Sequence, residues 1–157
     1  MKTNNLTSKS NDTPLVSVIM NCHNGQKFLK DAILSILNQT YKEIELIFYN
    51  NFSSDQSENI VKSLNDIRIK YFNSKKFLSL YEARNAAIKK SSGEYITFLD
   101  TDDLWEKDKI EKQLEFFKKN KNIQILYTNY YLFKYSKNDS KKFFKTKKPS
   151  GMITQQL

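Results

Sequence analysis

Short apolar runs alternate along this chain with segments that carry helix signals, and this alternation limits the possible folds more than any other feature of the sequence. The apolar runs have strand length and favour β-branched and aromatic residues. They occupy residues 15–20, 43–49, 67–72, 94–99 and 123–135, the last of which predicts one or two strands. The segments with helix signals are 28–37, about 54–64, 81–90 and 106–119. The chain is therefore predicted to be an α/β domain with a mostly parallel sheet flanked by helices on both faces.

The composition fits a folded domain. With 157 residues, of which 39% are hydrophobic, the chain can bury a core of its own. Cys22 is its only cysteine, so no internal disulfide can form, which fits a reducing cytosol. No apolar run is long enough to span a bilayer, and the polar residues 1–13 lack the apolar core of a signal peptide. We therefore expect a cytoplasmic protein.

Changes in composition set the expected domain boundaries. Residues 1–13 are predicted to be a flexible leader, residues 14–135 the folded domain, and residues 136–157 a lysine-rich segment. Seven lysines lie between Lys134 and Lys148, which fits either a polar hairpin or a loose, solvated segment.

The net charge of +9 raises the question of an anionic partner. Of the 26 basic residues only Arg68 and Arg84 are arginines, and the others are lysines. Because proteins that read nucleic acids rely on arginine for bidentate contacts, a nucleic-acid binder is not favoured. Attraction to phosphates or to an anionic membrane face stays open, beside the simpler interpretation that the lysines keep the chain soluble.

Three carboxylates follow the apolar run 94–99 almost at once: Asp100, Asp102 and Asp103. In parallel sheets ligands bind beyond the carboxyl ends of the strands, so the loops after the first, second and fourth runs should share one edge. Asp100 and Asp102 leave the strand on alternate residues and can face a common space. Two such carboxylates make a hard-oxygen site for Mg²⁺ or Mn²⁺, whose remaining positions suit the phosphates of a nucleotide.

Simpler interpretations compete for several residues. Asp103 with Glu106 fits a capping box at the start of the fourth predicted helix. An aspartyl dyad for proteolysis is another option, but nothing else in the sequence supports it. Arg84 could pair with Glu82 or with another surface acid, and Cys22 could be a small buried filler after the first strand.

An ordered set of motifs resembles a known family. The strand and turn "VSVIMNCHNG", then "QTY", "ARN", "GEYITFLD" and "DDLW", follow one another between about Leu15 and Tyr131. A lone Asp-x-Asp would be a weak signal, but this set in this order closely resembles the family 2 glycosyltransferases of the GT-A fold. The resemblance implies that residues 14–135 are a Rossmann-like domain that binds a nucleoside-diphosphate sugar with Mn²⁺ or Mg²⁺. It further implies transfer of the sugar to a glycan or lipid-linked acceptor, as in surface polysaccharide synthesis.

The resemblance also implies roles for single positions. The turn after the first strand would line the nucleotide pocket, and the loop after the second would contact the base or ribose. Arg84 would meet the base or the diphosphate, Asp100 would touch the ribose, and Asp102 of the DXD motif would hold the metal. The implied donor-binding residues are Asn21, Cys22, His23, Asn24, Asn50, Asn51, Arg84, Asp100 and Thr101, with Asp102 as the metal ligand.

Two departures from the family pattern bear on function. Asn50 and Asn51 stand where the family usually has an acid, and an amide accepts a hydrogen bond more weakly than a carboxylate. The acceptor-binding half of the inverting enzymes is expected beyond Leu157, and no acceptor base is identified within the chain. The alternative is therefore a truncated or degenerate nucleotide-binding module without turnover. An uncovered sheet edge would also favour self-association, and a lipid-linked acceptor would place the protein at the inner face of the membrane.

Overall fold

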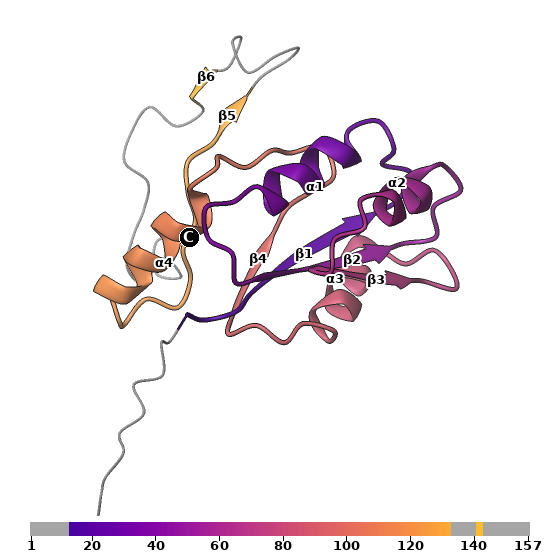
Figure 1. Cartoon of the computed structure of the whole chain (residues 1–157). Coiled ribbons are helices and arrows are strands. Elements are labelled where there is room, and N and C mark those ends of the chain that lie inside the picture. Colours follow the sequence, from indigo (N-terminus) through magenta and orange to yellow (C-terminus); the bar gives the residue numbers. More distant parts are fainter. Residues whose placement is uncertain (1–12, 133–140, 143–157) are drawn as a thin grey trace, which may run out of the picture. The chain divides into compact units, whose positions relative to one another are not determined.

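The computed structural model describes residues 13–132 and 141–142 (Figure 1). Contacts divide the chain into two compact units, Met1–Glu115 and Phe116–Leu157. The elements are β1 (Val16–Cys22), α1 (Leu29–Leu37), β2 (Ile44–Asn50), α2 (Ser57–Ser63), β3 (Ile69–Asn73), α3 (Leu80–Ile88), β4 (Tyr95–Phe98), α4 (Lys109–Lys119), β5 (Tyr131–Leu132) and β6 (Lys141–Lys142). None of the helices in the described part is long and apolar enough to cross a membrane.

The first four strands form one parallel sheet in the order β3-β2-β1-β4. β1 pairs with β2 on one side and with β4 on the other, and β2 pairs with β3. The chain thus moves outward from β1 in one direction and then returns to its other side at β4. In open α/β sheets the crevice at such a reversal is where ligands bind. The predicted parallel α/β sheet is confirmed, and the reversal lies between the loops that follow β1 and β4.

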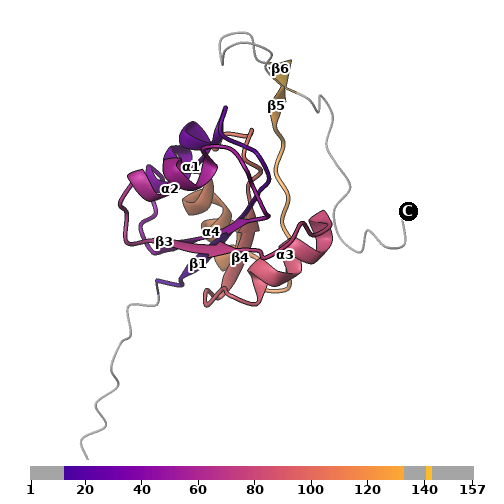
Figure 2. The same ribbon diagram turned by 90° about the vertical axis from the view of Figure 1, so that its right-hand side faces the viewer.

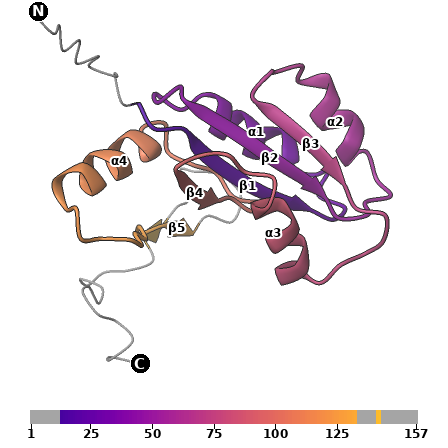
Figure 3. The ribbon, with the colours of Figure 1, turned by 90° about the horizontal axis from the view of Figure 1, so that it is seen from below.

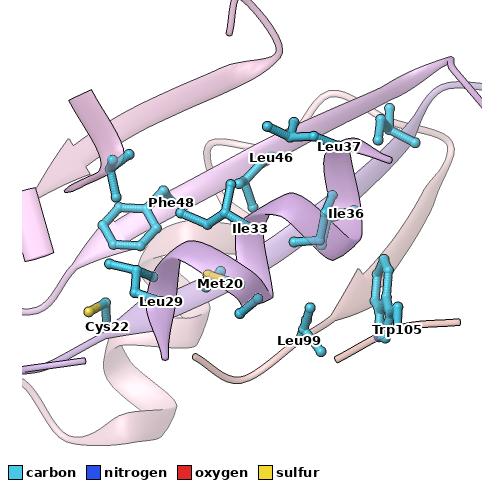
Figure 4. Packing of buried hydrophobic residues seen from close by; sticks show 14 of the residues in the cluster. Met20, Cys22, Leu29, Ile33, Ile36, Leu37, Leu46, Phe48, Leu99 and Trp105 are labelled. Carbon is cyan, nitrogen blue, oxygen red and sulfur yellow. The ribbon is translucent and has the colours of Figure 1, made fainter. Parts of the chain in front are cut away.

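Helices cover both faces of the sheet, which explains why nearly every residue of β1 and β2 is buried and most of them are apolar. On one face Met20 packs against Leu29 and Ile33 of α1 within the larger core (Figure 4). On the other face Ile19 packs with Ala87 of α3 in a smaller cluster. Figure 2 and Figure 3 show α1 and α2 on one side of the strands and α3 on the other.

The fourth helix begins later than the sequence predicts. α4 starts at Lys109, so the expected capping box of Asp103 with Glu106 is wrong. The side chain of Gln39, two residues after the end of α1, holds the chain here in another conformation. The buried Gln39 donates to the carbonyl of Glu106 at 2.8 Å and accepts from the backbone N–H of Ile110 at 3.1 Å. These two bonds hold the chain just before α4 and at the second residue of the helix, so the helix begins at Lys109 and not at Glu106.

The expected strand or strands over residues 123–135 form only in part. Residues 123–130 are not in a strand, and Tyr131–Leu132 pairs antiparallel with Lys141–Lys142 in a sheet of its own. Ile125 is 81% exposed, so the alternating apolar pattern of its segment does not bury this side chain. An apolar pattern alone does not stabilise a strand, which also needs a neighbouring strand to pair with. Residues 133–135, most of the lysine-rich segment and residues 1–12 lie outside the described residues.

A buried carboxylate that the sequence did not reveal ties together the amino ends of the strands. Glu45 of β2 is 3% exposed and accepts from the Ser17 hydroxyl and from the backbone N–H of Ser92 at 2.7 Å. Lys70 of β3 forms an ion pair with it. Burial by itself raises the pKa of Glu45, but the bonds from Lys70, Ser17 and Ser92 together lower that pKa from 4.5 to about 2.

This shift predicts how stability depends on pH. Because the pKa of Glu45 is lower in the folded than in the unfolded chain, the carboxylate stabilises the fold above pH 4.5, and this contribution is lost as the pH falls toward 2. We expect Glu45→Gln to cost about 2–3 kcal/mol of unfolding free energy at pH 7 and almost nothing near pH 2. Urea titrations of both proteins over that range measure the difference. If the unfolding free energies of the two proteins change with pH in the same way, protonation of Glu45 does not affect stability.

Candidate functional site

Three loops that the sequence singled out do meet at one edge of the sheet. Because β1, β2 and β4 are parallel, their carboxyl ends point the same way, and Cys22 at the end of β1 is in register with Asn50 at the end of β2. We define the carboxyl edge as residues 21–26, 50–57, 74–79 and 100–103. It holds every position for which the resemblance implies a role except Arg84, which α3 supplies.

Hydrogen bonds join residues 21–26, the end of β1 and the turn after it (the β1 turn), to the loop after β2. Asn24, which has a positive φ of 54°, accepts from the backbone N–H of Ser54 at 2.9 Å. The next two backbone N–H groups donate to Ser57 Oγ at 3.1 Å and to Asp55 Oδ2 at 2.9 Å. Asn24 is therefore a turn residue that fixes the two loops together. No local sequence pattern indicates that Asp55 and Ser57 bind this turn, because their partners are about thirty residues away along the chain.

The loop after β4 meets the same turn at Gly25. A Cβ atom on Gly25 would lie 2.9 Å from the Cys22 sulfur and 3.0 Å from Thr101 Oγ1, so these side chains would have to shift to make room for it. The contact between the two loops therefore favours glycine at this position. This close approach places Thr101 against the β1 turn, in the crevice where the strand order reverses.

Asn50 and Asn51 are committed to the protein itself. Asn50 is 1% exposed, donates to the Tyr71 hydroxyl at 2.8 Å and accepts from the backbone N–H of Ser53 at 2.9 Å. Asn51 is 5% exposed and bonds both the N–H and the carbonyl of Leu78, at 2.9 and 2.8 Å. These side chains hold the loop after β2 and the loop before α3 in place. Their donor-binding role stays a proposal, and in this arrangement it would act through loop position.

Arg84 lies beside the acid cluster. It donates from Nη2 to Asp100 Oδ1 at 2.8 Å, and its guanidinium carbon is 5.7 Å from the centre of the Phe98 ring. The alternative pairing with Glu82 does not occur, because Glu82 forms a capping box with Ser79 at the start of α3. Arg84 and Asp100 are both partly exposed, so the pair is screened by solvent and adds little to stability. Its position at the edge leaves the pair accessible to a ligand.

Asp102 and Asp103 complete the cluster. Asp102 is exposed, and in the described part of the chain its carboxylate has no hydrogen bond or ion pair. Burial, followed by repulsion from Asp102 and Asp100, raises the pKa of Asp103. Within residues 13–132 and 141–142 no group of three or more His, Cys, Asp or Glu side chains could hold a metal. An unpartnered carboxylate close to a second one nevertheless fits Mg²⁺ or Mn²⁺, since these cations use one or two carboxylates together with substrate phosphates.

The remaining residues of the β1 turn differ in what they offer a ligand. Cys22 is 1% exposed in the core, which confirms the interpretation of this residue as a buried filler. His23 is exposed and donates from Nδ1 to the carbonyl of Asn51 at 3.0 Å. The Asn21 amide nitrogen is buried and has no hydrogen-bond partner among the described residues. Such an orphan donor is uncommon in a folded protein and suits an acceptor brought by a ligand.

Sequence comparison identifies related proteins. A family model described as glycosyl transferase family 2 matches residues 17–156. An uncharacterized glycosyltransferase of Haemophilus influenzae is 41% identical over 119 residues, which cover 74% of this chain and 47% of that protein. The UDP-Glc:alpha-D-GlcNAc-diphosphoundecaprenol beta-1,3-glucosyltransferase WfgD of Escherichia coli is 40% identical over 119 residues, which cover 76% of this chain and 47% of WfgD. The chain spans about half the length of each of these two relatives.

Solved structures share the fold. S. aureus TarS 1–349 in complex with UDP-GlcNAc matches with a TM-score of 0.65 at 25% identity, over 68% of this chain and 32% of that one. The mannosyltransferase PcManGT from Pyrobaculum calidifontis, solved with GDP-Man and Mn²⁺, matches with a TM-score of 0.62 at 20% identity, over 66% and 32%. The second likeness is informative about the fold alone.

Proposed function

Since this chain belongs to glycosyl transferase family 2 and has the sheet of a GT-A fold, we propose that it is the donor-binding part of an enzyme that transfers sugar from a nucleoside diphosphate. The observation that carries the proposal is the ion pair of Arg84 with Asp100 at the carboxyl edge, two positions before the exposed Asp102. Arg84 pairs with Asp100 at 2.8 Å, and the carboxylate of Asp102 is exposed close by in sequence. A cation and a carboxylate beside a strand-order reversal suit a phosphate-bearing ligand.

The charge balance of this edge suits a metal–diphosphate better than a bare diphosphate. Asp100, Asp102 and Asp103 would repel phosphates, and Arg84 alone does not neutralise them. Asp102, with help from Asp100, would hold Mn²⁺ or Mg²⁺ against the diphosphate, which matches the hard-oxygen preference of both ions. When bound, such an ion supplies positive charge that stabilises the leaving diphosphate. Arg84 would add to this stabilisation from α3.

The donor that we propose to test first carries uridine. WfgD is named for UDP-Glc, and TarS was solved with UDP and with UDP-GlcNAc. The orphan amide of Asn21 and the exposed ring of His23 lie at the β1 turn, where the resemblance expects the nucleotide. Thr101, packed against that turn, would line the same pocket.

The acceptor would be a glycan or a lipid-linked sugar, with transfer of the inverting type that the resemblance implies. WfgD supports a lipid-linked acceptor, because its name specifies a diphosphoundecaprenol substrate. An enzyme with such an acceptor would work in the cytoplasm at the inner face of the membrane, where lysine side chains would favour contact with anionic lipid. The outer edge of β4 has no partner strand in the described part, and Ile96 and Phe98 are 43% and 46% exposed there, which supports self-association.

Calorimetric titration of UDP and UDP-sugars into the chain, with and without Mn²⁺, tests the proposal. Metal-dependent binding of UDP supports it, and no binding of any nucleoside diphosphate in either condition would contradict it. Release of UDP in the presence of a sugar acceptor distinguishes the enzyme from its rival, a nucleotide-binding module without turnover, because both would bind the nucleotide.

Replacing Arg84 tests the role of the cation. We expect Arg84→Ala to weaken UDP binding by about 1.5–3 kcal/mol, the range for hydrogen bonds to charged groups, with little change in Tm. The chain offers a matched control in Arg68, which pairs with Asp66 and donates to the carbonyl of Leu37 at 3.2 Å. Arg68→Ala should lower stability and leave the affinity for UDP unchanged. If Arg84→Ala loses stability and binds UDP normally, Arg84 has a structural role.

A further inference from the structure

We propose that the Phe77 ring, held in place against His23, forms an aromatic platform on which the nucleobase of the donor stacks. The inference rests on the proposed function and adds a residue for which neither the motifs nor the family resemblance implied a role. The Phe77 ring is 58% exposed, and its centre lies 4.7 Å from that of His23 at an interplanar angle of 64°. Exposure of one aromatic ring is ordinary on a protein surface. The Phe77 ring is distinguished by its contact with His23 of the β1 turn, where the nucleotide is expected.

The loop that carries Phe77 is firmly held. Ser74 donates its backbone N–H to the carbonyl of Asn50 at 2.8 Å, and the Ser74 hydroxyl donates to the carbonyl of Lys76. On the other side of Phe77, Asn51 bonds both backbone groups of Leu78. The ring is thus fixed at the edge before a ligand arrives, which lowers the conformational entropy that binding would cost.

The second ring is fixed in the same way. The His23 Nδ1 atom donates to the backbone carbonyl of Asn51, and the Asn51 side chain bonds Leu78, the residue after Phe77, so Asn51 helps to position both rings of the pair. A T-shaped pair leaves ring faces open to a third ring, and both residues are exposed.

The loop after β2 has little capacity left to recognise a base by hydrogen bonds. Asn50 and Asn51 follow β2, where a hydrogen-bonding contact to the base or ribose is expected. Each has its amide nitrogen and its amide oxygen bonded inside the protein, and neither is more than 5% exposed. Base recognition then depends mainly on stacking, which tolerates different bases because every base has a π face. We therefore expect affinity for the base with weak selectivity among bases.

The test compares Phe77→Leu with Tyr81→Leu, a matched removal of an exposed aromatic ring from the same region of the chain. Mn²⁺ complexes of UDP, GDP, ADP and inorganic pyrophosphate serve as ligands in calorimetry. We expect Phe77→Leu to weaken all three nucleotides about 5- to 100-fold and to leave pyrophosphate unchanged, because only the nucleotides carry a base. Tyr81→Leu should leave all four affinities unchanged, and Phe77→Trp should restore nucleotide affinity.

The outcomes separate this inference from the proposed function. A wild-type chain that binds no nucleoside diphosphate overturns both. Wild-type nucleotide binding that Phe77→Leu leaves unchanged overturns the platform alone. Equal weakening of nucleotides and pyrophosphate also overturns it, because Phe77 would then act on the loop as a whole. Saturation-transfer NMR of bound UDP gives an independent readout: saturation of the base protons, relative to the ribose protons, should fall in Phe77→Leu.

Discussion

Replacing Asp102 by Asn should abolish Mn²⁺-dependent UDP binding while the chain stays folded. The carboxylate has no partner among the described residues, so its loss breaks no internal bond. A neutral amide is a much weaker ligand for a hard divalent cation than a carboxylate. Removing a negative charge also relieves the repulsion that contributes to the raised pKa of Asp103, so Tm should not fall. Calorimetry of UDP with and without Mn²⁺, together with thermal unfolding, measures both effects.

Asp103→Asn is the matched control, because it removes the same charge one position further on. We expect it to keep most of the metal dependence, because the family resemblance assigns the metal to Asp102 of the DXD motif and not to Asp103. If metal-dependent binding survives in Asp102→Asn and disappears in Asp103→Asn, our proposal names the wrong carboxylate as the metal ligand. Survival in both variants would contradict a metal site at this edge altogether.

The second large effect concerns stability, and we expect it from Gly93→Ala. A Cβ atom there would lie 2.7 Å from both the Leu15 carbonyl oxygen and the Ser17 backbone nitrogen, and 2.6 Å from Ser17 Oγ. Two of these atoms belong to the backbone of β1 and of the residue just before it. This backbone cannot move without disturbing the pairing of the central strand. The change would also disturb the bond from the Gly93 N–H to Ser17 Oγ at 2.8 Å, next to the buried Glu45. We expect a loss of about 3 kcal/mol or more.

Gly25→Ala is the variant to compare with Gly93→Ala. The atoms that its Cβ would meet, the Cys22 sulfur and Thr101 Oγ1, belong to side chains. The same added methyl group should therefore cost clearly less than at Gly93, because side chains adjust more easily than a paired strand. Urea unfolding of both variants gives the two values. Similar losses at the two glycines would mean that the backbone beside Gly93 yields more readily than its hydrogen bonds suggest.

The sequence predicted the sheet because the signal for it is local and repeated. Apolar runs of strand length and intervening helical stripes are properties of neighbouring residues, and short βα connections leave few topologies open. The same reasoning brought the loops after β1, β2 and β4 to one edge, since parallel strands end on the same side. It failed for residues 123–130, whose apolar pattern is strand-like but whose pairing depends on another segment.

The location of the candidate site and its residue types could be predicted from the sequence. The hydrogen-bond and ion-pair partners of its side chains could not. The sequence by itself identified Asp100, Asp102 and Asp103 as an unusual group of charges, and the family resemblance added Arg84 to the expected site. Only the tertiary structure decided that Arg84 pairs with Asp100 and that the Asn51 side chain holds the loop that carries Phe77. Arg84 and Asp100 are 16 residues apart in the chain, and Asn51 and Leu78 are 27 apart. Such contacts form when separate loops fold onto one sheet edge, and no local pattern encodes which side chains will meet there.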